Sequence, residues 1–316
     1  MQYPENGHDK LNAFGSPVIG RQFYHQLKKI YSMKKLNIKT LLIALLVSAS
    51  FIPLKAQTIN TPPPSPSQTI KQQFALSEIE LTYARPAAKG RKIMGDLVPY
   101  NEVWRTGANA STKLKFGEDV KIAGTVVPKG EYALYTIPSK DEWTIILSKN
   151  ITLWGSSGYK ESEDLLRFKV KPTTSAMNME NLTMQFANLK NESMDLHLMW
   201  ENTMISFPIV ADIDGRITKQ ITDAMAPTDR RPYFAAASYY FESGKDLNKA
   251  HEWVKKAVEL KPEQFWVEHL KAKIEMKMGN KREAILSANR SMENAKTQNN
   301  ADYVALNQKL IAEAKK

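Results

Sequence analysis

Hydrophobic and polar residues alternate with a period of two through the middle of the chain. In one such run Trp143, Ile145 and Leu147 are separated by polar residues, and Trp200 lies on the apolar side of another, so both tryptophans are expected in a core. Similar runs of about five to eight residues, a length typical of strands, begin at Leu114, Leu166, Leu182, Met194 and Ile205. Turn-forming Gly, Pro, Asn and Asp follow the runs. The pattern predicts a mainly β domain, an antiparallel sandwich or jelly-roll-like fold of about nine strands, over residues 75–225.

After residue 228 the spacing of apolar residues becomes that of a helix. Small or apolar residues of one segment reappear 34 residues later in the next: Ala250, Val254 and Ala257, then Ala284, Ala288 and Ser291. This is the period of tetratricopeptide repeats. We predict an all-α, tetratricopeptide-like domain over residues 229–316, with two helical hairpins and a capping helix over 301–316. Such repeats bind protein or peptide partners, although a structural brace for the β domain is an equal alternative.

The segment over residues 33–56 has the features of a signal peptide. It begins with Lys34 and Lys35, continues with the apolar run Leu41–Leu54, and ends with the small residue Ala56. The apolar run is shorter than the roughly 20 residues that span a bilayer. A single-pass anchor is the alternative. Either interpretation predicts an exported protein, whether periplasmic, secreted or associated with the cell surface.

Two further segments flank the expected signal peptide. Residues 1–32 have no strong periodicity, and we interpret them as an overextended start, with Met33 as the true initiator. Residues 57–74 begin with a proline-rich sequence that lacks the apolar content to pack, which predicts a linker.

The net charge of +11 would favour a nucleic-acid ligand only if the basic residues gathered on one surface. Residues 1–56 contain 8 Lys or Arg and 2 Asp or Glu, a net +6; residues 57–228 contain 19 and 19; residues 229–316 contain 17 and 12, a net +5. The excess in the last segment accompanies mixed-sign pairs such as Glu252 and Lys256, which are typical of a solvated helix face. We therefore expect no nucleic-acid partner.

Several kinds of catalytic or metal site are excluded by the residue types present. The chain has no cysteine, which excludes disulfides, thiol nucleophiles and zinc–cysteine sites. His197 is the one histidine of the expected β domain and lies on the polar side of its strand. Ser157 and Lys160 match the Ser-x-x-Lys pattern of penicillin-interacting enzymes, but the companion motifs are missing. We therefore expect no metal site, no cofactor and no catalytic residue from these motifs.

The residues best suited to bind a ligand are cationic, aromatic or amide side chains. They are Arg85, Arg91, Trp104, Arg105 and Asn109. Arginine offers forked donors for carboxylate or sugar oxygens, and tryptophan offers a flat apolar face. Because Trp104 and Arg105 are adjacent, they point to opposite faces of a strand, so we expect one to be buried and the other available. The alternative for this stretch, VWRTGANAST at 103–112, is a turn at Gly107 capped by Asn109.

Three long stretches of the expected β domain carry a family resemblance. They read YARPAAKGRKIMGDLVPYNEVWRTGAN at 83–109, VVPKGEYALYTIPSKDEWTIILSKN at 126–150 and MDLHLMWENT at 194–203. These stretches resemble the DUF2911 family, a domain of unknown function common in exported Bacteroidetes proteins. The resemblance supports the β-domain boundary and the envelope location, and it implies no catalytic residues.

Three functional hypotheses follow. The first is an exported, non-catalytic binding or interaction protein, with a small-molecule or glycan ligand on the β domain and a protein or peptide partner on residues 229–316. The alternative is an envelope hydrolase or carbohydrate-active enzyme that works through carboxylates such as Glu102 or Glu201. A scaffold whose helical tail docks a partner is a third possibility.

Overall fold

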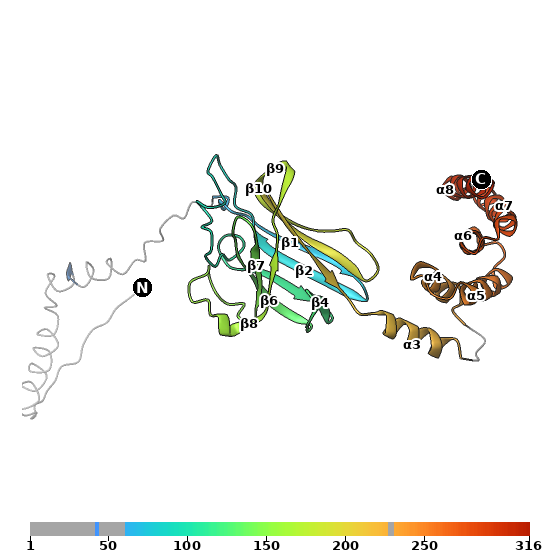
Figure 1. Cartoon of the computed structure of the whole chain (residues 1–316), viewed down its shortest axis with the longest axis horizontal. Coiled ribbons are helices and arrows are strands. Elements are labelled where there is room, and N and C mark those ends of the chain that lie inside the picture. Colours follow the sequence, from blue (N-terminus) through green and yellow to red (C-terminus); the bar gives the residue numbers. More distant parts are fainter. Residues whose placement is uncertain (1–41, 44–60, 227–230) are drawn as a thin grey trace, which may run out of the picture. The chain divides into compact units, whose positions relative to one another are not determined.

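The computed structural model describes residues 42–43, 61–226 and 231–316, and these ranges contain strands followed by helices (Figure 1). The strands are β1 (Ser67–Phe74), β2 (Ser77–Ala84), β3 (Thr112–Phe116), β4 (Val120–Ile122), β5 (Thr125–Val127), β6 (Gly130–Ile137), β7 (Trp143–Ser148), β8 (Asp164–Val170), β9 (Thr173–Ala187) and β10 (Ser193–Val210). A 3₁₀-helix, η1 (Glu161–Glu163), precedes β8. The α-helices are α3 (Asp214–Ala224), α4 (Tyr233–Glu242), α5 (Leu247–Leu260), α6 (Phe265–Lys277), α7 (Lys281–Thr297) and α8 (Ala301–Ala314).

Two predictions from the sequence concern residues that are not described. The overextended start over 1–32 and the signal peptide over 33–56 lie outside the described residues, apart from Leu42 and Ile43. Within the described part of the chain, no helix has the length and apolar character needed to cross a membrane.

The strands form two antiparallel sheets. One sheet has six strands in the order β1-β2-β3-β6-β7-β8, and the other has four in the order β5-β4-β10-β9. The six-stranded sheet is a meander, from which the chain leaves after β3 to add β4 and β5 to the other sheet and then returns as β6. The predicted antiparallel β region is therefore confirmed.

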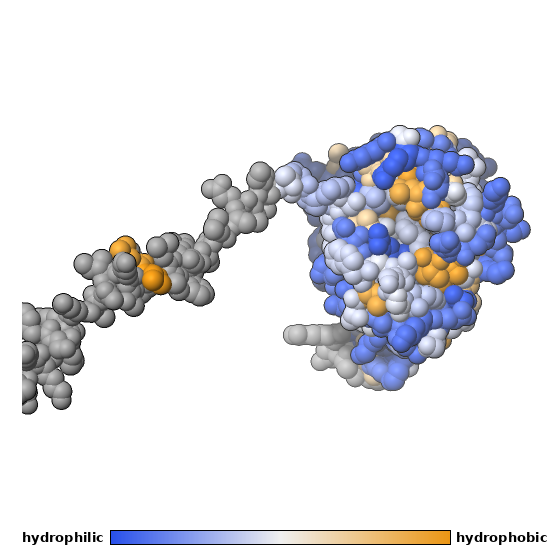
Figure 2. Space-filling model, turned by 90° about the vertical axis from the view of Figure 1, so that its left-hand side faces the viewer, coloured by the Kyte–Doolittle hydropathy of each residue, from blue (hydrophilic) through white to orange (hydrophobic). Residues whose placement is uncertain are grey.

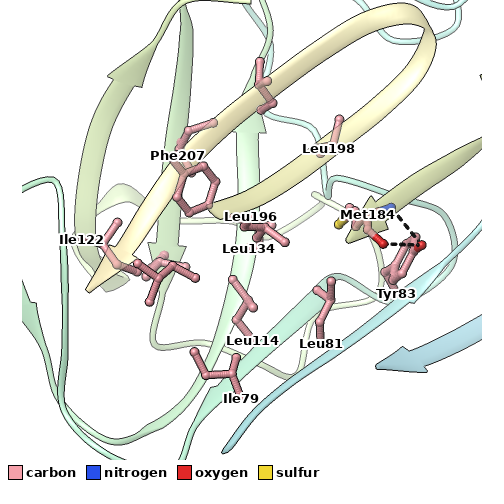
Figure 3. Packing of buried hydrophobic residues seen from close by; sticks show 14 of the residues in the cluster. Ile79, Leu81, Tyr83, Leu114, Ile122, Leu134, Met184, Leu196, Leu198 and Phe207 are labelled. Carbon is pink, nitrogen blue, oxygen red and sulfur yellow. Dashed lines mark hydrogen bonds between the residues drawn. The ribbon is translucent and has the colours of Figure 1, made fainter. Parts of the chain in front are cut away.

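The two sheets bury one hydrophobic core between them (Figure 3). The alternating apolar residues of β2, β3 and β6 face those of β4 and β10, so the period of two read from the sequence is the period of burial. Trp143 and Trp200, each 1% exposed, lie in this core as predicted. The Tyr83 hydroxyl donates to the Met184 carbonyl oxygen at 3.2 Å and accepts from the Met184 N–H at 2.9 Å, which ties the sheets together. Burial raises the pKa of Tyr83, so this hydroxyl stays protonated.

Two elements lie where the sequence predicts none. β1 falls within residues 57–74, which the sequence assigns to the linker, because Ile70 and Phe74 are its only strongly apolar residues. As an edge strand it is half exposed, and it pairs with β2 along its whole length. α3 follows β10 almost directly, and Ile213 and Ile217 attach it to the core. The ordered β region therefore begins before residue 75.

The described residues after Arg231 form two helical hairpins and a final helix. α4 packs with α5, and α6 packs with α7, which also contacts α8. The residues that repeat after 34 positions are buried: Ala250, Val254 and Ala257 in α5, and Ala284, Ala288 and Ser291 in α7. Asp246 caps α5 through the Asn248 N–H at 2.8 Å, and Asn300 caps α8 through the Tyr303 N–H at 3.0 Å. The small residues thus serve helix packing.

A buried ionic network joins α6 to α7. The side chains of Glu268 and Glu275 are only 3% and 4% exposed, and Lys271 lies between them with its Nζ 3.6 Å and 3.4 Å from their Oε1 atoms. From α7, Arg290 pairs with Glu268 at 2.7 Å, and the Ser287 hydroxyl donates to Glu275 at 2.6 Å. These contacts compensate the cost of burying both carboxylates. We call these five residues the α6 ionic network.

Candidate functional site

The stretch from Val103 to Thr112 is held against β6. Trp104 forms an isolated antiparallel bridge with Thr136, with N···O distances of 2.8 and 2.9 Å. The Thr106 hydroxyl donates to the Thr136 hydroxyl at 3.2 Å, and the Thr112 hydroxyl donates to the Thr106 carbonyl oxygen at 2.7 Å. All three threonines are buried. These hydrogen bonds fix the backbone on both sides of Arg105.

The turn in this stretch differs in detail from the one predicted at Gly107. The left-handed residues are Thr106, with φ of 55°, and Asn109, with φ of 61°. Gly107 fits closely, because an added Cβ would lie 3.2 Å from Thr112 Oγ1 and 3.3 Å from the Ala84 carbonyl oxygen, so its neighbours would have to shift by a few tenths of an ångström. A β-branched residue such as threonine adopts positive φ only at a cost, so the buried hydrogen bonds of Thr106 hold a strained backbone next to Arg105.

Trp104 and Arg105 point to opposite faces of the six-stranded sheet, as the sequence predicts, but both are half-buried, so neither is the fully buried member of the pair that the sequence leads us to expect. Trp104 packs against the core, stacked on Trp200 at a centroid distance of 5.9 Å and edge-on to Trp143 at 6.4 Å. Its indole N–H donates to the Gly107 carbonyl oxygen at 3.1 Å. The Trp104 indole therefore serves the packing of the core, whereas Arg105 faces the opposite side of the sheet.

Arg105 lies on the outer face of the sheet, beside the loop that joins β7 to β8. A Cβ added to Gly155 of this loop would be 2.8 Å from a terminal guanidinium nitrogen of Arg105, so the glycine makes room for the arginine. The Arg105 Nε is buried and has no hydrogen-bond partner among the described residues. The side chain is half-buried as a whole. A cation in this position can offer its forked donors to an anionic ligand.

Two tyrosines and an ion pair continue the site beyond Gly155. The Tyr135 hydroxyl reaches the Gly155 carbonyl oxygen at 3.4 Å, and the Tyr135 and Tyr159 rings lie 5.2 Å apart. The Tyr159 hydroxyl donates to Asp164 Oδ2 at 2.6 Å, and Arg167 Nε lies 2.8 Å from the same oxygen. We call Arg105, Tyr135, Gly155, Tyr159 and Asp164 the Arg105 cluster.

Burial controls the protonation of this cluster. It raises the pKa of Tyr159, and the hydrogen bond to Asp164 raises it further, so the hydroxyl remains a donor at neutral pH. Burial also raises the pKa of the Asp164 carboxyl, although Tyr159 and Arg167 act in the opposite direction. The Asp164 side chain is 6% exposed, and its Oδ1 has no hydrogen-bond partner among the described residues. The cluster therefore holds a buried donor on Arg105 and a buried acceptor on Asp164 whose hydrogen-bonding capacity the described residues leave unused.

The other sequence candidates have partners within the protein. Arg85 binds β9 through the Leu182 carbonyl oxygen at 3.1 Å and the Thr183 hydroxyl at 3.0 Å. Arg91 binds two carbonyl oxygens of its own loop at 2.9 and 2.7 Å. Asn109 donates to a carbonyl oxygen of the segment before β1 at 3.3 Å, so it ties distant backbone together rather than capping a local turn. Arg105 thus differs from Arg85 and Arg91, whose guanidinium groups donate hydrogen bonds to other described residues.

The carboxylates of the hydrolase hypothesis lie elsewhere. Glu102 is exposed in the turn before Trp104. Glu201 lies in an irregular part of β10 with φ of 48°, and its carboxylate accepts from the Ile93 N–H at 3.3 Å. The hollow of about 150 Å³ beside Asn202 is lined by no carboxylate of the described residues. Within the same described ranges, no group of three or more His, Cys, Asp or Glu side chains could hold a metal ion.

A larger hollow of about 650 Å³ lies next to β4 and β5 and has charges of both signs. Glu118 pairs with Arg216 of α3, and Lys121 pairs with Asp212 at 2.9 Å. Asp119 accepts from a backbone N–H at 2.8 Å. Because its charged groups largely satisfy one another, this hollow is a weaker candidate than the Arg105 cluster.

The ligand-binding candidates predicted from the sequence do not include Tyr135, Gly155, Tyr159 or Asp164. In the β7–β8 loop the sequence pattern points to Ser157 and Lys160 instead, and both of these residues are exposed. A usable signal was present: Trp154, 73% exposed, and Gly155 stand together in a loop without a strand pattern. The surface drawn in Figure 2 is mostly hydrophilic with separate small hydrophobic patches, so that face shows no broad apolar patch.

The fit between Gly155 and Arg105 can be tested by replacing Gly155 with Ala. Both Gly155, at φ of +91°, and Gly124, at φ of +78° with open space around it, lose about 1–2 kcal/mol of unfolding free energy on this change because the left-handed backbone disfavours Cβ. Only Gly155→Ala is expected to shift the NMR resonance of the Arg105 Nε–H, assigned by its loss in Arg105→Lys. An equal response to Gly124→Ala would contradict the packing of Arg105 on Gly155.

One part of the chain is similar to a known protein family. No curated protein and no solved structure matches it. Residues 65–209, which contain both sheets, the Arg105 cluster and nearly all of β10, match the family described as "Protein of unknown function (DUF2911)", and this match supports assigning the two-sheet region to that family.

Proposed function

We propose that this protein is an exported, non-catalytic binding protein whose two-sheet region holds an anionic small molecule or glycan through Arg105. The observation that carries the proposal is the Arg105 guanidinium. It is held on a rigid backbone, its Nε is buried, and no described residue accepts a hydrogen bond from that Nε. A carboxylate or phosphate can accept two parallel hydrogen bonds from an arginine, which matches the need of this side chain.

The surroundings of Arg105 favour recognition over chemistry. Tyr159 remains protonated and can donate but not act as a base at neutral pH. The described histidines lie in β10, α5 and α6, and none has a hydrogen bond or ion pair with the cluster. Trp154 offers a flat apolar face next to Gly155, a surface on which a sugar ring can stack.

The helical region completes the proposal as an interaction module. Its two hairpins and final helix have the order of a tetratricopeptide-like array, and we propose that residues 229–316 bind a protein or peptide partner. We also propose that the two sheets form a jelly-roll-like fold and that residues 33–56 direct export of the protein. Its location would then be periplasmic, secreted or at the cell surface.

The test is a ligand screen by thermal shift, using carboxylates, phosphates and acidic sugars, followed by titration of the stabilising compound. Arg105→Ala is expected to weaken binding by about 1.5–3 kcal/mol, roughly a factor of 10 to 150, because a charged hydrogen bond is lost. Arg105→Lys should recover only part, since the ammonium lacks the fork.

Arg91→Ala is the matched control, because Arg91 is an exposed arginine whose donors bind its own loop. A ligand that binds wild type and Arg105→Ala equally would remove Arg105 from the site. Hydrolysis of a glycoside that is lost in Glu201→Gln or Glu102→Gln would instead establish the enzyme alternative.

A further inference from the structure

The helical region has a groove of about 400 Å³ formed by alternate helices. α4, α6 and α8 each contribute one face to it, and the lining includes Phe241 from α4, Lys273 and Lys277 from α6, and Leu306 and Lys309 from α8. Lys273 and Lys277 are one helical turn apart, so both project from the same face of α6. We call this feature the lysine groove.

The charge in the lysine groove is unbalanced. Its lining contains three lysines and one carboxylate, Glu313. Lys273, Lys277 and Lys309 are exposed, and none of them forms an ion pair with a carboxylate of the described residues. His269 also lines the groove, and burial lowers its pKa, so its ring adds no positive charge at neutral pH. The local potential therefore favours an anionic occupant.

The remaining lining is apolar. Met276, Leu306 and Leu310 also line the groove, and Leu306 is 47% exposed. The Lys273 ammonium stands 5.0 Å from the centre of the Phe241 ring, which holds this cation at the edge of the groove. An occupant that satisfies both features carries acidic and apolar side chains together.

We infer that the lysine groove binds an acidic peptide segment that also carries apolar side chains. This inference rests on the proposed partner-binding role of the helical region. Charge excludes the chain's own preceding segments as the occupant, because residues 1–56 have a net charge of +6 from 8 basic and 2 acidic residues, and residues 57–74 contain Lys71 as their one charged residue. A peptide fits better than a nucleic acid, because the groove offers aliphatic contacts and one aromatic ring already covered by a lysine.

The probe is a fluorescent peptide of alternating Asp and Leu, compared with the same peptide carrying Asn in place of Asp. Binding to the whole chain is measured by fluorescence anisotropy. The groove variant combines Lys273→Gln, Lys277→Gln and Lys309→Gln. The control variant combines Lys249→Gln, Lys255→Gln and Lys281→Gln, three exposed lysines outside the groove, so both proteins have the same net charge.

The groove variant is expected to bind the Asp/Leu peptide about tenfold more weakly, the combined effect of three exposed ion contacts. The control variant should stay within about twofold of wild type, since its lysines act only through screened long-range charge. Weak binding of the Asn/Leu peptide to wild type would support the charge requirement.

Four results would overturn the inference. They are no binding of the Asp/Leu peptide, equal weakening in both variants, equal affinity for the Asn/Leu peptide, and displacement by a single-stranded oligonucleotide at a lower concentration than by the unlabelled peptide. A natural protein partner that both variants retain equally would keep the partner-binding role of the helical region and overturn only the assignment to this groove.

Discussion

Replacing Lys271 with Met is expected to destabilise the helical region by about 3–5 kcal/mol, the cost of leaving a buried charge uncompensated. Lys271 is 13% exposed and lies between Glu268 and Glu275, both almost fully buried. Without its ammonium, Glu268 keeps Arg290, but Glu275 keeps only Ser287 and the ring of His251 at 3.2 Å. The loss is measured by urea unfolding, followed at the helical band of the circular dichroism spectrum.

Lys256→Met is the matched control for this prediction. Lys256 also pairs with a glutamate on a helix, Glu259 at 2.8 Å, but both side chains are more than half exposed. An exposed pair of this kind contributes about 0–1 kcal/mol. Similar losses in the two variants would mean that the α6 ionic network is solvated. A double variant, Lys271→Met with Glu275→Leu, should recover part of the loss, because it removes the carboxylate that Lys271→Met leaves uncompensated.

The regular elements of this fold could be predicted because the spacing of their apolar residues matches the spacing of their buried positions. The alternation in β7, for example, arises because Trp143, Ile145 and Leu147 face the core. The 34-residue repeat has the same origin, since only small side chains fit where the helices approach closely. β1 has no clear alternation of apolar and polar residues. As an edge strand it is stabilised mainly by backbone pairing with β2, which does not require particular side chains.

The candidate site could be predicted only in part, because it depends on contacts between distant segments. The alternation of faces correctly separated Trp104 from Arg105, a local geometric rule. The approach of Arg105 to Gly155 joins residues 50 positions apart, which no local pattern specifies. Arg85 and Arg91 resembled Arg105 in sequence, and only their hydrogen bonds to backbone carbonyl oxygens distinguish them. The arginines of the sequence therefore identified the region of the candidate site, and the Arg105 Nε without a hydrogen-bond partner identified Arg105 among them.

The position of Arg105 depends in turn on the indole stack beneath it. Trp104 is hydrogen-bonded through its backbone to β6 of the six-stranded sheet, and its ring stacks on Trp200 of the four-stranded sheet. Trp200 also donates from its indole N–H to the Glu180 carbonyl oxygen at 3.2 Å, so it is fixed by a polar contact as well as by packing. A change at Trp200 thus reaches the backbone that carries Arg105.

Trp200→Ala is expected to lower the unfolding free energy of the two-sheet region by about 3–5 kcal/mol, because it leaves a cavity in a closely packed core and removes the stacking partner of Trp104. Trp200→Phe should cost less than half as much: it keeps an aromatic ring, and the Glu180 carbonyl oxygen still accepts from the Ala88 N–H at 2.8 Å. Trp154→Ala, at a side chain 73% exposed, should stay within about 0.5 kcal/mol of wild type. Urea unfolding of the three variants measures the series, and a loss at Trp200 no larger than that at Trp154 would show that the indole stack does not support the core.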